Sequence, residues 1–171
     1  IGATLAARGF DTLDKALHFL NPSLDRDWLN PYDIDQMQEA VDQLYQAIVD
    51  NKHILVFGDF DLDGISATSI MTRGLRAVGA QATPFIPLRF EEGYGLSEAA
   101  IKRALTYKPD LIITVDNGIA CKNETPLLQE ASVDLIVTDH HEPSDLVPEN
   151  VVVVDPKCTN NESSLLAGAG V

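Results

Sequence analysis

Five short apolar runs, separated by segments with helical periodicity, constrain the fold of this chain more than any other feature. The runs that we expect to form strands are 53–57, 83–87, 111–115, 135–138 and 151–154. Between them, helical patterns cover 66–78, 96–107 and 122–131. Strands that alternate with helices of this length predict right-handed crossovers. The expected fold is therefore α/β, with a doubly wound, mostly parallel five-stranded sheet and helices on both faces.

Two more helical patterns, 12–20 and 33–51, precede the first expected strand. We therefore expect residues 1–52 to form an N-terminal helical extension and residues 53–171 to form the domain that carries the sheet. A length of 171 residues suits about one domain with its own core. The chain begins at Ile1 and stops at Val171 inside an apolar, glycine-bearing segment, so we expect it to be a piece of a longer protein.

The composition argues against several classes of protein. No apolar stretch approaches the roughly 20 residues that a membrane-spanning helix needs, and the N-terminus shows no signal-peptide pattern. Cys121 and Cys158 are too few and too isolated for a disulfide framework or a zinc site, which favours the cytoplasm. The net charge of −14 argues against a polyanionic partner, unless many of the acids bind divalent cations that reverse the local field.

Three aspartates in five residues, Asp59, Asp61 and Asp63, follow the first expected strand in the segment GDFDLDG (58–64). Because like charges raise one another's pKa, such a cluster usually holds a divalent cation. The pattern also resembles the start of an EF-hand calcium loop. However, Ile70 stands where that loop needs a glutamate, and a strand precedes the cluster where the EF-hand has a helix. A polar turn with an aspartate as helix cap accounts for only one of the three acids.

Polar clusters also follow the third and fourth expected strands. Asp116 lies in VDNGI (115–119), and Asp139, His140 and His141 lie in TDHHEP (138–143). Asp-Asn-Gly is also ordinary turn chemistry. Because the carboxyl ends of parallel strands meet at one edge of a sheet, we expect all these side chains to converge. Carboxylates with one or two imidazoles suit Mn²⁺ or Mg²⁺ better than zinc. Two such ions roughly 3.5–4 Å apart would generate a hydroxide and clamp a phosphoryl group.

These three motifs, in this order and at these strand ends, resemble the first three motifs of the DHH phosphoesterase family. PLRFEEGYGL (87–96), LAGAGV (166–171) and LNPS (20–23) are similar to its RecJ branch, the bacterial single-strand-specific 5′→3′ DNA exonucleases. The resemblance covers essentially the whole chain. It implies a hydrolase of DNA repair and recombination that uses two Mn²⁺ or Mg²⁺ ions on single-stranded DNA or an oligonucleotide. It also implies single-strand-binding protein and a helicase as partners, and no membrane.

The resemblance implies a role for each residue of the acidic and histidine motifs. Asp116 would bridge both ions, and His141 would face the scissile phosphate or an ion, so these two are the expected catalytic residues. Asp139 would be a ligand or would orient an imidazole. The implied metal ligands are Asp59, Asp61, Asp63, Asp116 and His140, with the two most direct ligands of the first motif left open.

The same resemblance implies a set of substrate-binding residues. Arg89 would contact substrate phosphate, since a guanidinium fork suits that task, and Gly93 and Tyr94 would shape its loop. Gly168 and Gly170 would let backbone N–H groups approach a phosphate at a helix start. For the two C-terminal glycines, a role in packing a helix on the sheet remains equally open.

The sequence departs from the family pattern in one respect. The fourth motif, an aspartate that completes the metal site, does not occur before Val171, and Asp155 is interpreted as a loop residue. We therefore expect this chain alone to be weakly active or inactive.

Two alternatives remain open. One is a relative that cleaves short oligoribonucleotides, cyclic dinucleotides or pyrophosphate with the same motifs. The other is a non-catalytic binding subunit of a replication complex. The N-terminal extension and PLRFEEGYGL argue against the first alternative. The intact first three motifs argue against the second.

Overall fold

The computed structural model describes residues 1–27, 29–158 and 162–171, and the chain divides into two compact units, 1–30 and 31–171. The second unit contains a five-stranded sheet in the order β2-β1-β3-β4-β5, and every neighbouring pair is parallel. Its strands are β1 (His53–Phe57), β2 (Gln81–Phe85), β3 (Leu111–Val115), β4 (Asp134–Thr138) and β5 (Val152–Val154). The expected α/β fold with five parallel strands is thus confirmed.

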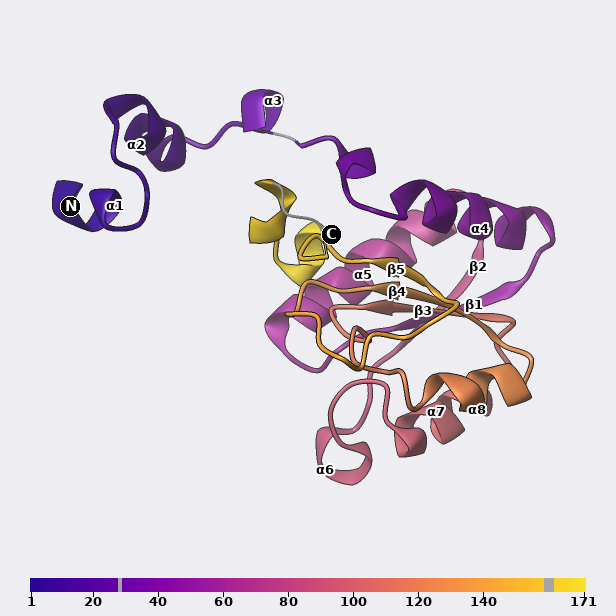
Figure 1. The fold of residues 1–171 in the computed structure, drawn as a ribbon. Coiled ribbons are helices and arrows are strands. Elements are labelled where there is room, and N and C mark those ends of the chain that lie inside the picture. The colour runs from indigo at the N-terminus through magenta and orange to yellow at the C-terminus, as the bar shows by residue number, and fades with distance from the viewer. Residues whose placement is uncertain (28, 159–161) are drawn as a thin grey trace. The chain divides into compact units, whose positions relative to one another are not determined.

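Helices cover both faces of the sheet, because each central strand buries side chains on both sides (Figure 1). Along β1, Ile54 and Val56 pack on one face, and Leu55 and Phe57 pack on the other. The first face is covered by α4 (Met37–Val49) and α5 (Leu62–Ala77), and the second by α7 (Glu98–Leu105) and α8 (Thr125–Glu130). Strands buried on both faces read as continuous apolar runs, which is why the sequence showed them so clearly.

The first unit consists of α1 (Gly2–Ala6), α2 (Leu13–Leu20) and α3 (Leu24–Asp27). Thr12 caps α2 by accepting a hydrogen bond from the backbone N–H of Lys15, and the rings of Phe10 and Phe19 pack 4.3 Å apart. α4 belongs to the other unit, where Ala40 and Ala47 are buried against the sheet. By compactness the chain therefore divides near residue 30. The expected boundary at residue 52, between a helical extension and the domain with the sheet, stays a prediction.

Several elements begin or end at other residues than the sequence indicated. Strand β2 covers Gln81–Phe85 and not 83–87, because α5 closes in a tight turn at Gly79 (φ +89°) and pairing with β1 starts directly after it. Helix α5 begins at Leu62 and not at residue 66, since Asp61 caps it. The short helix α6 (Arg89–Glu92) stands where no regular structure was expected.

One residue at each edge of the sheet hinders the pairing of a further strand. In β2, Pro84 has no N–H to offer to a further strand. At the other edge, the Gln36 side-chain oxygen accepts a hydrogen bond from the backbone N–H of Val153 in β5 at 3.0 Å. In the part of the chain that the structure describes, no helix combines the length and the apolarity needed to cross a membrane.

Candidate metal centre

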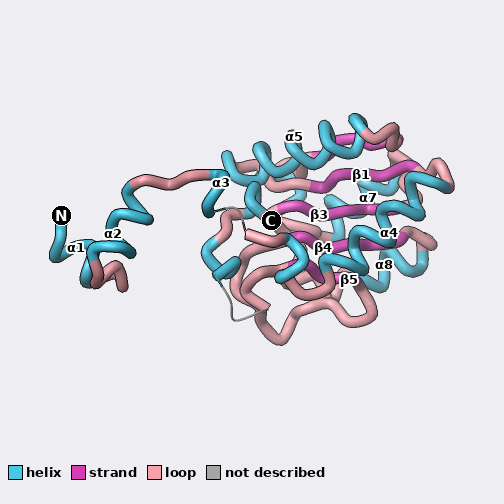
Figure 2. The backbone as a smooth tube through the Cα atoms, turned by 90° about the horizontal axis from the view of Figure 1, so that it is seen from above, coloured by secondary structure: helices cyan, strands magenta, loops and turns pink. Residues whose placement is uncertain are grey.

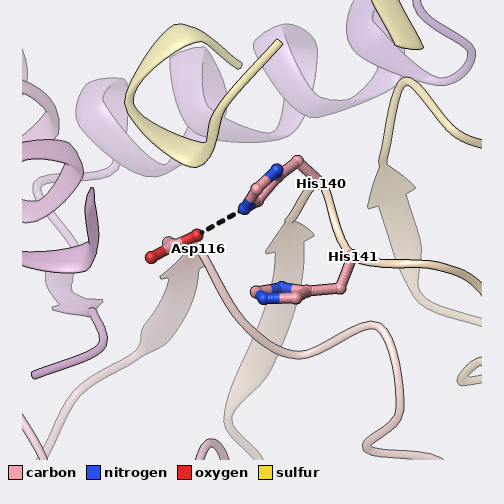
Figure 3. Close-up of side chains that lie close together, drawn as sticks. All are labelled: Asp116, His140 and His141. Atoms are coloured by element: carbon pink, nitrogen blue, oxygen red, sulfur yellow. Dashed lines mark ion pairs between the residues drawn. The ribbon is translucent and has the colours of Figure 1, made fainter. Parts of the chain in front are cut away.

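The carboxyl ends of β1, β3 and β4 lie side by side, and the polar motifs follow them directly (Figure 2). Two groups of side chains there are close enough to hold an ion, with ligand atoms within 4.8 Å of one another. One group is Asp59, Asp61 and Asp116, and the other is Asp116, His140 and His141. Figure 3 shows the second group, in which the imidazoles of His140 and His141 both point toward the Asp116 carboxylate. Asp116 belongs to both groups.

Asp116 is held in an unusual backbone conformation. Its φ of +62° is in the left-handed region, which costs a residue with a Cβ of the order of 1 kcal/mol or more. The Asn117 side chain holds this turn by donating to the carbonyls of Val115 (3.0 Å) and Phe57 (3.3 Å). Gly118 follows at φ +110°, where a Cβ would lie 2.7 Å from the Thr114 hydroxyl. The turn therefore fixes the Asp116 carboxylate at the end of β3.

Two buried carboxylate oxygens in this cluster have no hydrogen-bond donor among the described residues, namely Oδ1 of Asp59 and Oδ1 of Asp116. The Asp116 oxygen lies 3.0 Å from Nε2 of His140, but not in hydrogen-bonding geometry. Burial, with the charge of Asp63, raises the pKa of Asp116 to about 6, and burial likewise raises the pKa of Asp59. Charged oxygens without donors are costly unless a cation pairs with them, and oxygens with imidazole suit Mn²⁺ or Mg²⁺. The residues present fit a divalent metal centre.

Asp63 differs from the other two aspartates of the first motif in its partners. Its carboxylate oxygens accept hydrogen bonds from the backbone N–H groups of Gly168 (2.9 Å) and Ala169 (2.8 Å), and Oδ2 lies 3.5 Å from Nε2 of His140. It is in neither ion-binding group. Asp61 caps α5 with one oxygen, 3.0 Å from the N–H of Gly64, and still reaches the first group. Of the three expected ligands, the structure therefore gathers Asp59 and Asp61 and engages Asp63 with the C-terminal segment.

Asp139 organises the DHH turn. It is buried, and its two oxygens accept hydrogen bonds from the backbone N–H groups of Ile119 (2.9 Å) and His140 (2.7 Å). The same carboxylate lies 2.7 Å from Nδ1 of His141. Because a carboxylate only accepts, Nδ1 carries the proton of the neutral ring, and Nε2 is the nitrogen without a proton. Burial lowers the pKa of His141, but the hydrogen bond and charge of Asp139 outweigh it, so the pKa of His141 is raised overall.

The loop after β2 places a second group of side chains beside the carboxylates. The guanidinium of Arg89 stacks on the ring of Phe60, 4.4 Å from its centroid, and Phe60 stands between Asp59 and Asp61. The Tyr94 hydroxyl lies 3.4 Å from Nε2 of His141. Burial, with the charge of Asp59, raises the pKa of Tyr94 to about 12, so this hydroxyl keeps its proton at neutral pH. Gly93 permits the turn between them, since its φ is +86°.

The two C-terminal glycines differ from the phosphate-binding expectation. The N–H of Gly168 donates to Asp63, and the N–H of Gly170 donates to the carbonyl of Ala167 at 2.8 Å. Neither N–H is therefore available to a phosphate in this conformation. A Cβ on Gly168 would lie 2.3 Å from Oδ1 of Asp116, so this glycine allows the chain to pass directly over the carboxylate. This contact is with a carboxylate and not with the sheet, so the phosphate-binding role and the helix-packing role of the two glycines both stay predictions.

Sequence reasoning set aside one acid that the structure places close by. Asp155 follows β5, as the other acids follow their strands, and it is fully buried with Oδ2 lacking a donor among the described residues. Burial raises its pKa to about 6. Its position directly after an apolar run was the available signal. Phe60 was also missed, and no sequence pattern distinguishes it as the partner of Arg89.

Comparison with known proteins identifies a family that this chain matches. Residues 53–171 match the model of the DHH family, N-terminal domain. Over 174 aligned residues the chain is 41% identical to "Single-stranded-DNA-specific exonuclease RecJ" of Bacillus subtilis, covering 100% of this chain and 22% of that protein. The chain thus spans less than a quarter of that relative's length.

Two solved structures agree with this result. A crystal structure of exonuclease RecJ bound to manganese aligns with a TM-score of 0.76 and 41% identity, covering 84% of this chain and 37% of that one. RecJ from Thermus thermophilus, in complex with Mn²⁺, aligns with a TM-score of 0.73 and 35% identity, covering 98% of this chain and 22% of that one.

Proposed function

This chain belongs to the DHH family, and we propose that it is the metal-binding N-terminal part of a RecJ-like exonuclease that hydrolyses single-stranded DNA from the 5′ end. One observation carries the proposal: Asp116 is shared by two groups that could each hold an ion. A shared carboxylate is what a two-metal phosphodiesterase needs, and relatives of 35% and 41% identity were crystallised with Mn²⁺.

We assign Asp59, Asp61, Asp116 and His140 to hold Mn²⁺ or Mg²⁺, with His141 beside them. When bound, the ions supply a nucleophile at neutral pH and offset the charge that develops on the phosphoryl oxygens. The chain itself positions these ligands. The strained turn fixes Asp116, and Asp63 holds the C-terminal segment against the same carboxylate.

The role of His141 follows from its hydrogen bond to Asp139. With Nδ1–H held by that carboxylate, Nε2 faces the Tyr94 hydroxyl and the Asp116 group. The raised pKa of His141 means that the ring takes up a proton more readily than a free imidazole does. A protonated Nε2 would donate to a phosphate oxygen, which supports the position that we propose for it at the scissile group.

Arg89 and Tyr94 are proposed to hold the substrate. Arg89 is exposed, and its guanidinium keeps N–H groups available while its plane rests on Phe60. Such a pre-oriented fork binds a phosphate at lower entropic cost than a free side chain does. The chain has a net charge of −14, so a cation beside the carboxylates is needed to attract a polyanion.

The decisive experiment compares substrates with the whole protein. Purified enzyme with Mn²⁺ is given 5′-labelled single-stranded DNA, the matching duplex, pApA and pyrophosphate, and products are followed over time. The proposal predicts mononucleotide release from the single strand alone. Turnover of pApA or pyrophosphate in preference to DNA would indicate the small-substrate branch of the family. No turnover of any substrate would indicate a binding subunit.

A substitution connects that activity with the site. Asp116→Asn removes the shared charge while keeping the size of the side chain, so turnover should fall at least about 10³-fold while far-UV circular dichroism stays the same. Retention of more than about a tenth of the activity would contradict the two-metal assignment. The 171-residue chain alone should be weakly active or inactive.

We also propose a cytoplasmic location and contacts of the whole protein with single-strand-binding protein and a helicase. The likeness of the chain to a bacterial DNA exonuclease supports these assignments. Affinity purification of the tagged whole protein from nuclease-treated extract, followed by mass spectrometry of the eluate, tests both contacts. Absence of both proteins from the eluate would contradict this part of the proposal.

A further inference from the structure

A cavity of about 340 Å³ lies between α5 and the edge strand β2, and the proposed nuclease function makes no use of it. In Figure 2, α5 runs along this edge of the sheet. Its wall includes Ile65, Thr72, Arg73 and Arg76 from α5 and Pro84 and Ile86 from β2 and the residue after it. None of the proposed metal ligands lines it.

The charge of this cavity is opposite to that of the chain. The net charge is −14, yet the lining contains two arginines and no acid. Arg73 has no ion-pair or hydrogen-bond partner among the described residues. Arg76 uses Nε to donate to the carbonyl of Ala82 at 2.9 Å, and its other N–H groups have no described acceptor. Two guanidinium groups therefore stand ready for an anion, for which their planar forks are suited.

A buried hydroxyl in the same wall also lacks a partner. The hydroxyl of Thr68 donates to the carbonyl of Gly64, as threonine in a helix commonly does. One turn later, Thr72 is only 4% exposed and its hydroxyl has no partner among the described residues. Because this oxygen is itself covered by protein atoms, an occupant of the cavity would meet the two arginines and not this hydroxyl.

The remaining lining consists of Ser69 and the apolar residues Ile65, Pro84 and Ile86. Ile65 is 51% exposed, and on the same helix Leu62 and Ile70 are 81% and 59% exposed. Pro84 removes the N–H that an added strand would need, so recognition here depends on side chains and not on extension of the sheet. An occupant must therefore bring an apolar side chain as well as an anion.

We propose that this cavity binds an acidic peptide segment of a partner protein, with a carboxylate on Arg73 and Arg76 and an apolar side chain on Ile65 and Ile86. A nucleic acid fits less well, for two reasons. Bases stack on aromatic rings, and this wall has none. A phosphate backbone needs a longer row of cations than two.

The test uses the ¹⁵N-labelled chain and three probes followed by NMR. The probes are an acetylated peptide of alternating aspartate and leucine, the same peptide with asparagine for aspartate, and a short oligo(dT). The acidic peptide should give saturable shifts at the amides of Thr72, Arg73 and Ile86, and the asparagine peptide should bind at least about tenfold more weakly. Equal shifts with the asparagine peptide, stronger binding of oligo(dT) at these amides, or no binding would overturn the proposal.

Charge reversal supplies the matched control. Arg73→Glu should weaken the acidic peptide at least about tenfold while leaving the dispersion of the spectrum unchanged, since the side chain is exposed. Lys102→Glu makes the same change of charge on α7, which covers the opposite face, and should leave peptide affinity within about twofold. Equal losses for both variants would show a general effect of charge, and the proposal would fail.

Discussion

At the scale of single residues, the metal centre depends on close approach of backbone to carboxylate. Gly168 passes over Asp116 so closely that a methyl group would overlap the carboxylate, while Asp63 binds the N–H of the same glycine. This arrangement places a segment from the end of the chain against a turn far earlier in the sequence. Only a residue without a Cβ fits there.

Gly168→Ala is therefore expected to weaken the metal centre. The new Cβ would lie 2.3 Å from Oδ1 of Asp116, so the carboxylate or the segment must shift. We expect a loss of stability of about 1–3 kcal/mol and at least about a tenfold loss of Mn²⁺ affinity by isothermal titration calorimetry. Gly170→Ala is the control, because its Cβ would meet the flexible Leu166 side chain at 3.3 Å. Unchanged affinity in Gly168→Ala would contradict the close-contact argument.

At the scale of elements, the loop that carries Arg89 and Tyr94 is anchored to α7 by one arginine. Arg103 pairs with Glu92 through Nε and Nη2, and Nη2 also donates to the carbonyl of Ile86 at 2.8 Å. Its guanidinium lies over the ring of Phe85, 4.0 Å from the centroid. The pair with Arg103 lowers the pKa of Glu92, whose side chain is only 8% exposed.

Removing this anchor should affect both stability and substrate binding. Arg103→Ala leaves the Glu92 carboxylate unpaired, so we expect a loss of about 2–4 kcal/mol and a raised KM for single-stranded DNA in the whole protein. Urea unfolding and steady-state kinetics measure the two effects. Lys102→Ala removes only an exposed pair with Glu98 and should cost less than about 1 kcal/mol. Similar losses in both variants would show that Arg103 is not the anchor.

At the scale of the whole chain, the two compact units make truncation informative. Deleting residues 1–30 leaves both core clusters intact, so the free energy of unfolding should change by less than about 1 kcal/mol. Deleting residues 1–52 also removes α4, which covers one face, and Gln36, which pairs with β5. That shorter chain should lose cooperative urea unfolding, as followed by circular dichroism. Cooperative unfolding of residues 53–171 would contradict this expectation.

The acidic cluster also makes stability depend on pH and metal. The pKa values of Asp116 and Asp155 are raised to about 6, above the ordinary value of about 3.9. A carboxyl group whose pKa is higher in the folded state than in the unfolded state stabilises the fold while it is protonated. This stabilisation is complete below the pKa of the unfolded state and is lost as pH rises through the pKa of the folded state. Without metal, the free energy of unfolding should therefore fall between about pH 4 and pH 7, on the order of 1–3 kcal/mol.

Urea denaturation in EDTA at about pH 5 and pH 7.5 measures this loss, and Mn²⁺ at the higher pH should reverse part of it by offsetting the charge of Asp116. Asp155→Asn is the control, since it should reduce the loss in EDTA while keeping the response to Mn²⁺. Greater stability at the higher pH than at the lower one without metal would contradict the sign.

The sequence by itself determined the sheet and the motifs at its edge. Strands buried on both faces appear as apolar runs, and parallel strands must bring Asp59, Asp116 and His140 to one edge. These are local patterns and a topological rule, so one sequence suffices to predict them. The family resemblance rested on the same motifs, and the match of residues 53–171 confirmed it.

Only the tertiary structure decided how each side chain is used. Sequence spacing treated Asp59, Asp61 and Asp63 alike, but the fold gives Asp63 two backbone donors from the far end of the chain. It also buries Asp155 beside the site and occupies the N–H of Gly168. The physical reason is that the hydrogen-bond partners and the burial of a side chain depend on contacts between segments that are distant in the sequence. Local sequence patterns do not specify those contacts.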